Sequence, residues 1–353
     1  MATRIRTAAL TVVLVGALLA SIVFTISFGS AGVPAGEVFG ILWDQVAHGG
    51  SEIAAGQWSV PHYMIIWNIR LPRVLFGVLC GAGLALCGAV MQALVLNPIA
   101  DPYVLGVSSG ASAGAAWALL MPLPLFAGSS QTMLMALAGA LLSSFLVYSM
   151  ARIAGGGRLR PVSLLLSGTA INAVMTAIMN FLIFLAKSPE SIAAVYNWQM
   201  GSLASAQWST LLFPLVAVGL GLVIFWGCSG RLDILMMGDD DALAMGLPVK
   251  AFRNAMFFVC AVLVASLVSF TGLIGFVGLV VPHVVRILTG SNSNRVVIPL
   301  SALLGGVYLI WADAIARSAF GSAELPIGII TAFVGAPFFL YLMAKSRYGG
   351  GDR

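Results

Sequence analysis

The sequence predicts an all-α, polytopic membrane protein with ten transmembrane helices in a single domain, residues 1–353. Of the 353 residues, 60% are hydrophobic and only 8% are charged, whereas soluble domains carry roughly 25% charged residues. The apolar residues also gather in ten long runs, and about 20 apolar residues cross the ~30 Å hydrocarbon core as a helix. Helices are expected throughout because a helix satisfies its own backbone hydrogen bonds in lipid.

The ten predicted spans cover residues 8–28, 74–96, 103–122, 131–151, 162–186, 209–227, 255–271, 273–289, 296–316 and 326–344. The first span follows a basic leader, MATRIRT, which raises the alternative of a cleaved signal peptide. Its apolar run of about 20 residues is longer than the 7–15 residues of a signal peptide's apolar region. We therefore expect a retained span.

Two segments between spans are too long to be simple turns. Residues 30–73 contain Gly, Pro and mixed polarity, and we expect a partly helical extracytoplasmic cap. Residues 228–254 form the second segment, which we expect to be a cytoplasmic loop.

Lys and Arg predict the orientation, because cytoplasmic loops carry an excess of these residues. With ten spans both termini lie on one side, and that side holds 13 of the 17 Lys and Arg residues. The other four are Arg70, Arg73, Lys187 and Arg317. We therefore expect both termini in the cytoplasm. The excess of Lys and Arg on the cytoplasmic side accounts for the net charge of +5, so nucleic-acid binding is not expected.

Motifs of several catalytic classes are missing from the sequence. No GxxxxGK[ST] motif is present to bind ATP, and HExxH does not occur. The four cysteines include no CxxC pair; Cys80 and Cys87 lie about 10 Å apart along one helix, too far for a disulfide. We expect no catalytic site, metal site or cofactor in this chain.

The cytoplasmic loop contains the features of a short capped helix. Three aspartates, Asp239 to Asp241, follow Gly238, and acidic residues favour the positive end of a helix. Gly246 and Pro248 are typical of a helix end. The apolar LDILMM segment lies just upstream, and an exposed apolar patch more often marks a contact site than a plain connector. A solvated connector is the alternative.

Small residues four apart predict tight helix packing in two spans. They are Gly77 and Gly81 in the second span, and Gly106, Gly110 and Gly114 in the third. This signal is general to polytopic proteins and carries no information about substrate.

The fifth span carries a polar stripe: Thr169, Asn172, Thr176 and Asn180. Their spacings of three and four residues put them on one helical face. Buried Asn side chains face protein or water rather than lipid, which favours a translocation pathway, with hydrogen bonding between helices as the alternative. Met175 and Met179 lie nearby and are expected to fill packing gaps.

Ionisable residues within spans are scarce. Asp313 and Arg317 are four apart near the outer end of the ninth span and are expected to pair. No carboxylate is evident near the bilayer midplane, which disfavours an ion-coupled secondary carrier. Arg70 and Arg73 lie on the outer side against the general charge bias, so an acidic partner or a lipid headgroup is expected there.

Several long motifs are similar to one known family. They are RLPRVLFGVLCGAGLALCGAVMQALVLNPIADPYVLGVSSGA, LDILMMGDDDALAMGLP, GLIGFVGLVVPHVVR and ADAIARSAFGSAELPIGIITAFVGAPFFLYLM. In this order they resemble the FecCD-like permeases of type II ABC importers for iron-siderophore, haem and cobalamin. The resemblance covers nearly the whole chain from about residue 60.

The resemblance implies a homodimer in the bacterial inner membrane, with two cytoplasmic ATPase subunits and one extracytoplasmic substrate-binding protein. ATP and Mg²⁺ would then be held by the ATPase partners. The loop would be the ATPase coupling element, through Leu232, Met237, Gly238, Asp239, Asp240, Asp241, Leu243 and Gly246. Three outer arginines would dock the binding protein: Arg70, Arg73 and Arg317.

Two cytoplasmic gates match family positions: Asn97 with Ile99, and Pro161 with Val162. The second gate departs from the small hydroxyl residues of the cobalamin permeases, which slightly disfavours cobalamin. An iron-siderophore complex is the first expected cargo on family abundance, haem the second and cobalamin the third. A secondary carrier is the alternative from another class.

Overall fold

The computed structural model describes residues 2–29, 32–54, 56–121, 129–319 and 323–348, and within these ranges it contains helices and no strand. The amino-terminal half contains α1 (Ala2–Ser27), α2 (Ala35–Ala47), α3 (Ser51–Ala54), α4 (Val60–Tyr63), the π-helical turn η1 (Met64–Arg70), α5 (Leu71–Leu94), the 3₁₀ turn η2 (Pro102–Leu105), α6 (Val107–Leu120), α7 (Ser129–Ala154) and α8 (Pro161–Phe184). The rest forms α9 (Pro189–Gln199), α10 (Trp208–Gly227), α11 (Ser229–Leu235), α12 (Asp239–Ala244), α13 (Val249–Thr271), α14 (Val277–Thr289), α15 (Asn294–Ser318) and α16 (Ile327–Tyr348). The predicted all-helical membrane class is confirmed.

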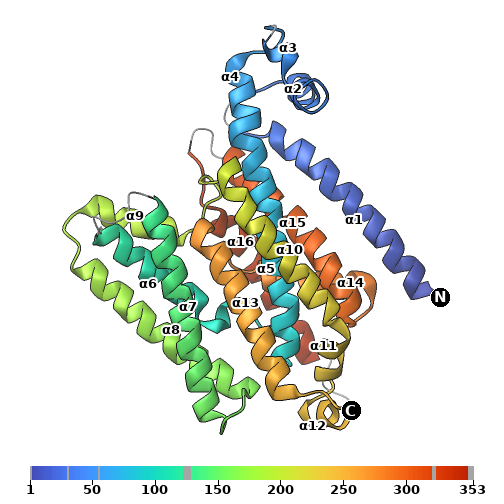
Figure 1. Ribbon diagram of the computed structural model, residues 1–353, viewed down its shortest axis with the longest axis vertical. Coiled ribbons are helices and arrows are strands. Elements are labelled where there is room, and N and C mark those ends of the chain that lie inside the picture. Colours follow the sequence, from blue (N-terminus) through green and yellow to red (C-terminus); the bar gives the residue numbers. More distant parts are fainter. Residues whose placement is uncertain (1, 30–31, 55, 122–128, 320–322, 349–353) are drawn as a thin grey trace.

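Helix α5 is the central element of the fold. It packs against α10, α13, α14 and α15, while α6 to α9 form a neighbouring group that joins the body through α13 (Figure 1). Close packing follows from small residues: a Cβ on Gly81 would lie 2.1 Å from the Gly305 carbonyl oxygen of α15. A Cβ on Gly114 would lie 2.0 Å from the Met135 carbonyl oxygen of α7. The predicted tight glycine contacts are therefore present.

Seven helices are long and apolar enough to cross a membrane among the described residues. They correspond to the first, second, fourth, fifth, sixth, seventh and ninth predicted spans. The third and eighth predicted spans are the short helices α6 and α14, of 14 and 13 residues. Helix α16 coincides with the tenth predicted span, and its residues Ile327–Leu342 form an apolar helix. The count of ten spans stays a prediction.

The second span differs from the prediction at its start. The helix runs from Val60 to Leu94 without a break, so it begins 14 residues before the predicted residue 74. The predicted cap over residues 30–73 therefore contains two separate helices, α2 and α3, followed by the outer end of this long helix. Figure 1 shows α2 to α4 at one end of the molecule and α12 at the opposite end.

Helix α1 is part of the packed structure. It lies along α15, and the Trp311 indole Nε1 donates a hydrogen bond of 2.9 Å to Ser21 Oγ. These contacts place α1 against the rest of the bundle, and the retained first span stays a prediction.

Candidate functional site

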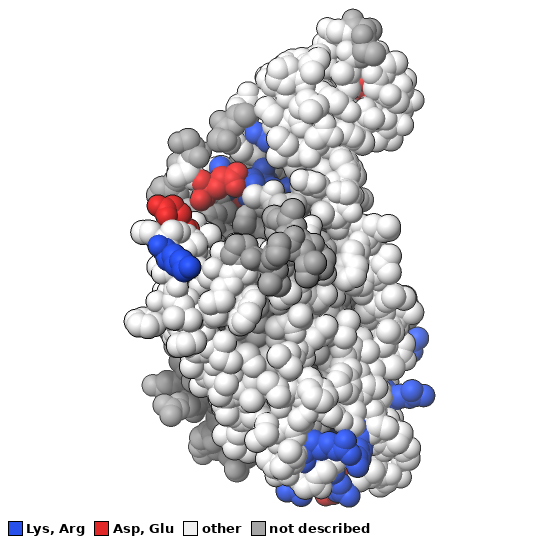
Figure 2. Space-filling view, turned by 60° about the vertical axis from the view of Figure 1, so that its left-hand side comes forward, with Lys and Arg blue, Asp and Glu red and all other residues white. Residues whose placement is uncertain are grey.

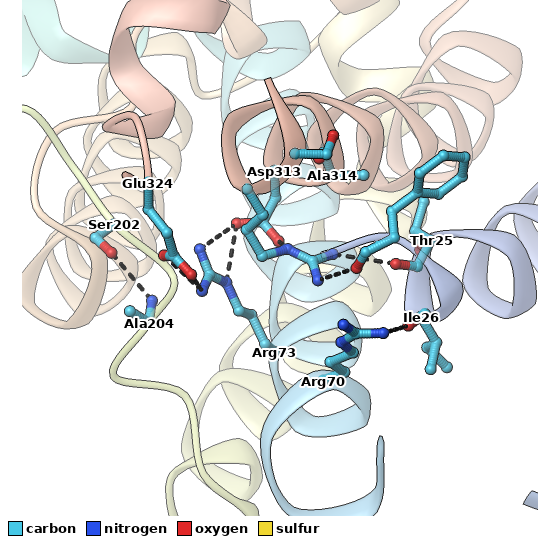
Figure 3. A network of polar contacts seen from close by, with 12 residues as sticks. Thr25, Ile26, Arg70, Arg73, Ser202, Ala204, Asp313, Ala314 and Glu324 are labelled. Carbon is cyan, nitrogen blue, oxygen red and sulfur yellow. Dashed lines mark hydrogen bonds and ion pairs between the residues drawn. The ribbon is translucent and has the colours of Figure 1, made fainter. Parts of the chain in front are cut away.

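The three arginines predicted on the outer side have polar contacts where α1, α5 and α15 meet. Figure 3 shows Arg70 and Arg73 there, and Arg317 joins them through Asp313. Arg73 binds Asp313 through Nε and Nη2 at 3.0 and 2.9 Å, and it binds Glu324 through Nη1 at 2.9 Å. Arg317 Nε lies 2.8 Å from the second oxygen of Asp313, so the predicted Asp313–Arg317 pair is confirmed. Asp313 thus holds two guanidinium groups.

Backbone carbonyl groups at the end of α1 hold the other arginine nitrogens. Arg70 Nη1 donates to the Ile26 carbonyl at 2.9 Å, and Arg317 donates to the carbonyls of Phe28 and Thr25 at 2.9 and 3.1 Å. A helix end has carbonyl groups without partners in its own helix, and these donors satisfy them. The network therefore joins the ends of three helices.

Burial changes how these arginines could meet a partner. Arg70, Arg73 and Arg317 are only 4%, 6% and 4% exposed, so they are interior groups rather than free surface charges. Glu324, in contrast, is 46% exposed while it binds Arg73. The predicted docking role stays a prediction, and the surface it would use includes Glu324.

The predicted cytoplasmic loop contains two short helices, α11 and α12, where one capped helix was predicted. No side chain caps the start of α12, whereas Gly246 and Leu247 donate backbone hydrogen bonds that close its end. Gly238 has φ of +113°, a conformation that favours glycine, and it precedes the three aspartates of α12. Met237 and Leu243 are 60% and 50% exposed and give the loop an apolar outer surface. Leu232, which we expected on the same contact surface, is instead fully buried. The reason is that α11 packs against α5 and α15, so Leu232 belongs to the core beneath the loop.

Arg253 connects this loop to another part of the same end of the molecule. Its two Nη atoms bind the Asp239 carboxylate at 2.9 and 2.7 Å, and Nη1 also donates to the Leu159 carbonyl at 3.0 Å. Hydrogen bonding from Arg253 holds the pKa of Asp239 below its usual value. Leu159 lies two residues before Pro161, so one buried side chain joins α12 to the start of α8.

The two predicted gate segments lie at helix ends. Asn97 follows α5, and its side-chain oxygen accepts a hydrogen bond from the Ile99 backbone at 3.1 Å. Pro161 is the first residue of α8, where a proline is favoured. Val162 is 67% exposed. The α5 end lies beside α11, and the α8 start is tied to α12 through Arg253, so both segments belong to the end that carries the loop.

The polar stripe on α8 divides into packed and open residues. Asn172 Oδ1 accepts a hydrogen bond of 2.6 Å from Ser109 Oγ of α6, which is the helix-to-helix bonding given above as the alternative. Thr169, Thr176 and Asn180 are exposed in the single chain. Met175 and Met179 are buried, as expected for packing residues.

A cavity of about 970 Å³ lies elsewhere, between α6, α7, α9, α10 and α13. Its lining includes Gln131, Asn197, Trp198, Ser205, Thr210 and Phe213, and none of the stripe residues. The Nε2 atom of Gln131 has no hydrogen-bond partner there. This cavity is therefore separate from the predicted pathway.

Sequence reasoning missed several polar contacts between distant segments. Gln92 of α5 accepts a hydrogen bond from Arg286 of α14 and donates to the carbonyls of Gly278 and Leu279. Asp233 of α11 accepts hydrogen bonds from Ser293 and from Asn294 at the start of α15. Separations of 60 to 194 residues leave no local pattern that could reveal these pairs.

Charged side chains gather at the two ends of the molecule. Figure 2 shows basic side chains at the end that carries α12, a mixed basic and acidic group toward the opposite end, and a mostly uncharged band between them. This distribution is that of a protein whose middle lies in lipid.

Comparisons with known proteins agree with these features. The model of a family described as the FecCD transport family matches residues 17–345. A cobalamin import system permease of Halobacterium salinarum is 40% identical over 289 residues, covering 81% of this chain and 76% of its own. A vitamin B12 import system permease of Salmonella paratyphi A is 40% identical over 299 residues, covering 83% and 88%.

Two further matches cover more of the chain. An ABC transporter permease of Bacillus subtilis, described as uncharacterized, is 36% identical over 335 residues, which is 94% of this chain and 92% of its own. A solved structure described as a metal-chelate type ABC transporter in an inward-facing conformation has a TM-score of 0.76 at 30% identity, covering 94% of this chain and 97% of its own.

Proposed function

The chain belongs to the FecCD transport family of ABC importer permeases, and from that premise we propose that it forms the membrane pathway of an ATP-driven cobalamin importer. The importer class follows from the family. Support for the cargo comes from the two relatives at 40% identity, both named as cobalamin or vitamin B12 permeases. Their names outweigh the family abundance that put an iron-siderophore complex first.

An iron-siderophore complex or haem is the second candidate cargo. It is supported by the structural relative described as a metal-chelate type transporter. The gate residues Pro161 and Val162, which lack small hydroxyl groups, also favour it. Both candidates are large metal chelates, and both would use the same mechanism.

The proposed assembly is a homodimer with two cytoplasmic ATPase subunits and one extracytoplasmic substrate-binding protein. ATP and Mg²⁺ would bind to the ATPase partners, because this sequence has no phosphate-binding motif for ATP. The excess of Lys and Arg on the side of the termini supports an inner-membrane protein with both termini in the cytoplasm.

The observation that carries the mechanism is the exposed apolar surface of α12 beside the buried Arg253 contact. Met237 and Leu243 would enter the ATPase surface, where apolar groups give the most binding energy. Asp239 would pass a displacement of α12 to Arg253, which holds the Leu159 carbonyl just before the gate residue Pro161. ATP-driven movement of the loop would thereby open or close the gate.

The pathway would lie between two copies of α8 at the dimer axis. Thr169, Thr176 and Asn180 are exposed in the single chain, and polar groups facing lipid are costly. A second copy would cover this face and line the passage with uncharged polar groups. Such a lining suits a pathway that must release its cargo.

The experiment is uptake by proteoliposomes that contain the permease, its ATPase subunits and the binding protein. Radiolabelled cyanocobalamin and radiolabelled ferric siderophore are compared as cargo, with and without ATP inside. We expect cyanocobalamin uptake that requires ATP and the binding protein. A scrambled GDDDALAMG segment is expected to abolish uptake without unfolding the permease.

Two results would contradict this proposal. Uptake of ferric siderophore but not cyanocobalamin would replace the cargo and keep the importer. Uptake driven by an ion gradient in ATP-depleted vesicles would instead identify a secondary carrier.

A further inference from the structure

In the outer arginine network, one acidic side chain, Glu324, is far more exposed to solvent than the other, Asp313. Asp313 is 2% exposed, and the carbonyl groups that bind Arg70 and Arg317 belong to the end of α1. Glu324 is 46% exposed and reaches Arg73 from the segment between α15 and α16 (Figure 3). It is therefore the one contact of Arg73 described here that faces outward.

The two ion pairs of Arg73 also differ in strength, and the more buried pair is the stronger. Breaking the buried Asp313 contact would leave a desolvated charge without a partner, which is strongly destabilising. The Glu324 contact is the weaker of the two, because its carboxylate is half exposed and can be hydrated when the pair opens. If Glu324 leaves, Arg73 keeps its contact with Asp313 but shares that carboxylate with Arg317, so a net positive charge remains for another carboxylate to pair with. Glu324 can therefore exchange with another carboxylate at little cost.

The geometry of Arg73 suits such an exchange. Its Nη1 atom lies 3.2 and 2.9 Å from the two oxygens of Glu324, while Nε and Nη2 bind Asp313. One edge of the guanidinium is thus fixed inside the protein, and the other is presented to a carboxylate from outside. A guanidinium binds carboxylates with this planar geometry.

We propose that Glu324 is an internal substitute for a carboxylate of the docking protein, occupying Arg73 until that protein displaces it. This inference rests on the proposed docking role of the outer arginines. Glu324 then lowers the affinity of the permease for an acidic partner, because docking must first break the internal contact. The partner is a protein surface that carries Asp or Glu.

The size of the effect follows from the weak exposed pair. A contribution of about 0.2–1 kcal/mol from the Arg73–Glu324 contact corresponds to a competition of up to about fivefold in apparent affinity. The effect falls at high salt, since exposed charges are screened over a Debye length of about 10 Å at 0.1 M salt.

The test measures binding of a hexaglutamate peptide to the full permease in phosphatidylcholine nanodiscs, with hexaglutamine as the uncharged probe. The variants are Glu324→Gln and Glu324→Ala. The matched control is Glu190→Gln, which removes an exposed glutamate at the start of α9, outside the described network. We expect Glu324→Gln to bind hexaglutamate about two- to fivefold more tightly at low salt, with the gain lost at high salt and no gain for Glu190→Gln.

Three outcomes would overturn the inference. They are unchanged or weaker hexaglutamate binding by both Glu324 variants, an equal gain in Glu190→Gln, or loss of binding in nanodiscs that contain phosphatidylglycerol, which would assign the site to lipid headgroups. Equal thermal midpoints of wild type and Glu324→Gln show that the fold is unchanged. The uptake assay separates the two proposals: ATP-driven uptake without a Glu324 effect rejects this inference alone, whereas uptake without ATP rejects the importer.

Discussion

Individual glycines in this protein permit backbone contacts that no other residue allows. Gly81 of α5 and Gly305 of α15 face each other, and a Cβ on either would lie within 2.4 Å of the other's carbonyl oxygen. A backbone atom cannot turn away as a side chain can, so the two helices must separate to admit a methyl group.

Gly81→Ala is therefore expected to destabilise the permease by about 1–3 kcal/mol or more. Gly219→Ala in α10 is the matched control, since nothing lies within 4 Å of its Cβ position. Thermal unfolding in detergent measures both variants. Equal midpoints for the two variants would contradict the close α5–α15 contact.

Asp101 gives the protein a pH dependence at a single residue. Burial raises the pKa of this carboxyl to about 6, although the Tyr103 backbone N–H donates to it at 2.8 Å. The folded-state pKa thus exceeds the unfolded value of about 3.9. The stabilising contribution of the neutral carboxyl is therefore fully present below pH ~3.9 and is lost as the pH rises through 6.

Asp101→Asn is expected to remove this loss, which amounts to up to ~3 kcal/mol, because an amide keeps the acceptor oxygen without a charge. The measurement is the thermal midpoint from pH 4.5 to 7.5, with Asp240→Asn on α12 as a second carboxylate removal. The wild type should lose stability relative to Asp101→Asn as the pH rises. Parallel curves for wild type and Asp101→Asn would reject the raised pKa.

At the scale of elements, α11 and α12 form a platform with a buried underside and an apolar outer side. Leu232 and Leu235 are fully buried beneath it, and Asp233 ties α11 to the start of α15 at 2.7 Å. The bidentate Arg253–Asp239 pair fixes α12 from the other side. A platform held in this way can transmit force rather than deform.

Met237→Ser with Leu243→Ser is expected to weaken association with the ATPase subunits by about tenfold or more, as interface anchors do. Their exposure of 60% and 50% means that the permease itself should keep its thermal midpoint. Val60→Ser, at an exposed apolar position in α4, is the control. Co-purification and ATPase titration measure the association. Unchanged association would remove α12 from the interface.

For the whole molecule, a single chain leaves the polar face of α8 open. In a twofold dimer, a residue that lies near the symmetry axis contacts the same residue of the second subunit. The proposed pathway puts Thr176 in that position, whereas Leu220 of α10, at 58% exposure, would face lipid.

Thr176→Cys is therefore expected to form disulfide-linked dimers in membranes under mild oxidation, and Leu220→Cys is not. Gel electrophoresis without reductant measures the linked fraction. Among the native cysteines, three are buried and Cys228 is half-buried, so the wild type gives the background. Equal crosslinking of both variants would contradict a dimer axis at α8.

The sequence by itself determined the properties that repeat along the chain. Hydrophobic runs specify membrane helices because lipid offers no hydrogen bonds to the backbone, and the Gly238–Asp241 pattern predicted the start of a short helix, which is α12. Small residues four apart predicted the close contacts of α5 and α6. Motif order also identified the family, which the match over residues 17–345 confirms.

Only the tertiary structure decided which polar groups meet. Arg73 binds Asp313 and Glu324, which are 240 and 251 residues away in the sequence. Arg253 binds the Leu159 carbonyl, 94 residues away. No local sequence periodicity extends over such separations. The sequence put these arginines at the outer ends of spans without indicating their burial, and in the structure they are buried while Glu324 is half exposed. The physical reason is that helix formation depends on neighbouring residues, whereas burial and charge pairing depend on which helices pack together.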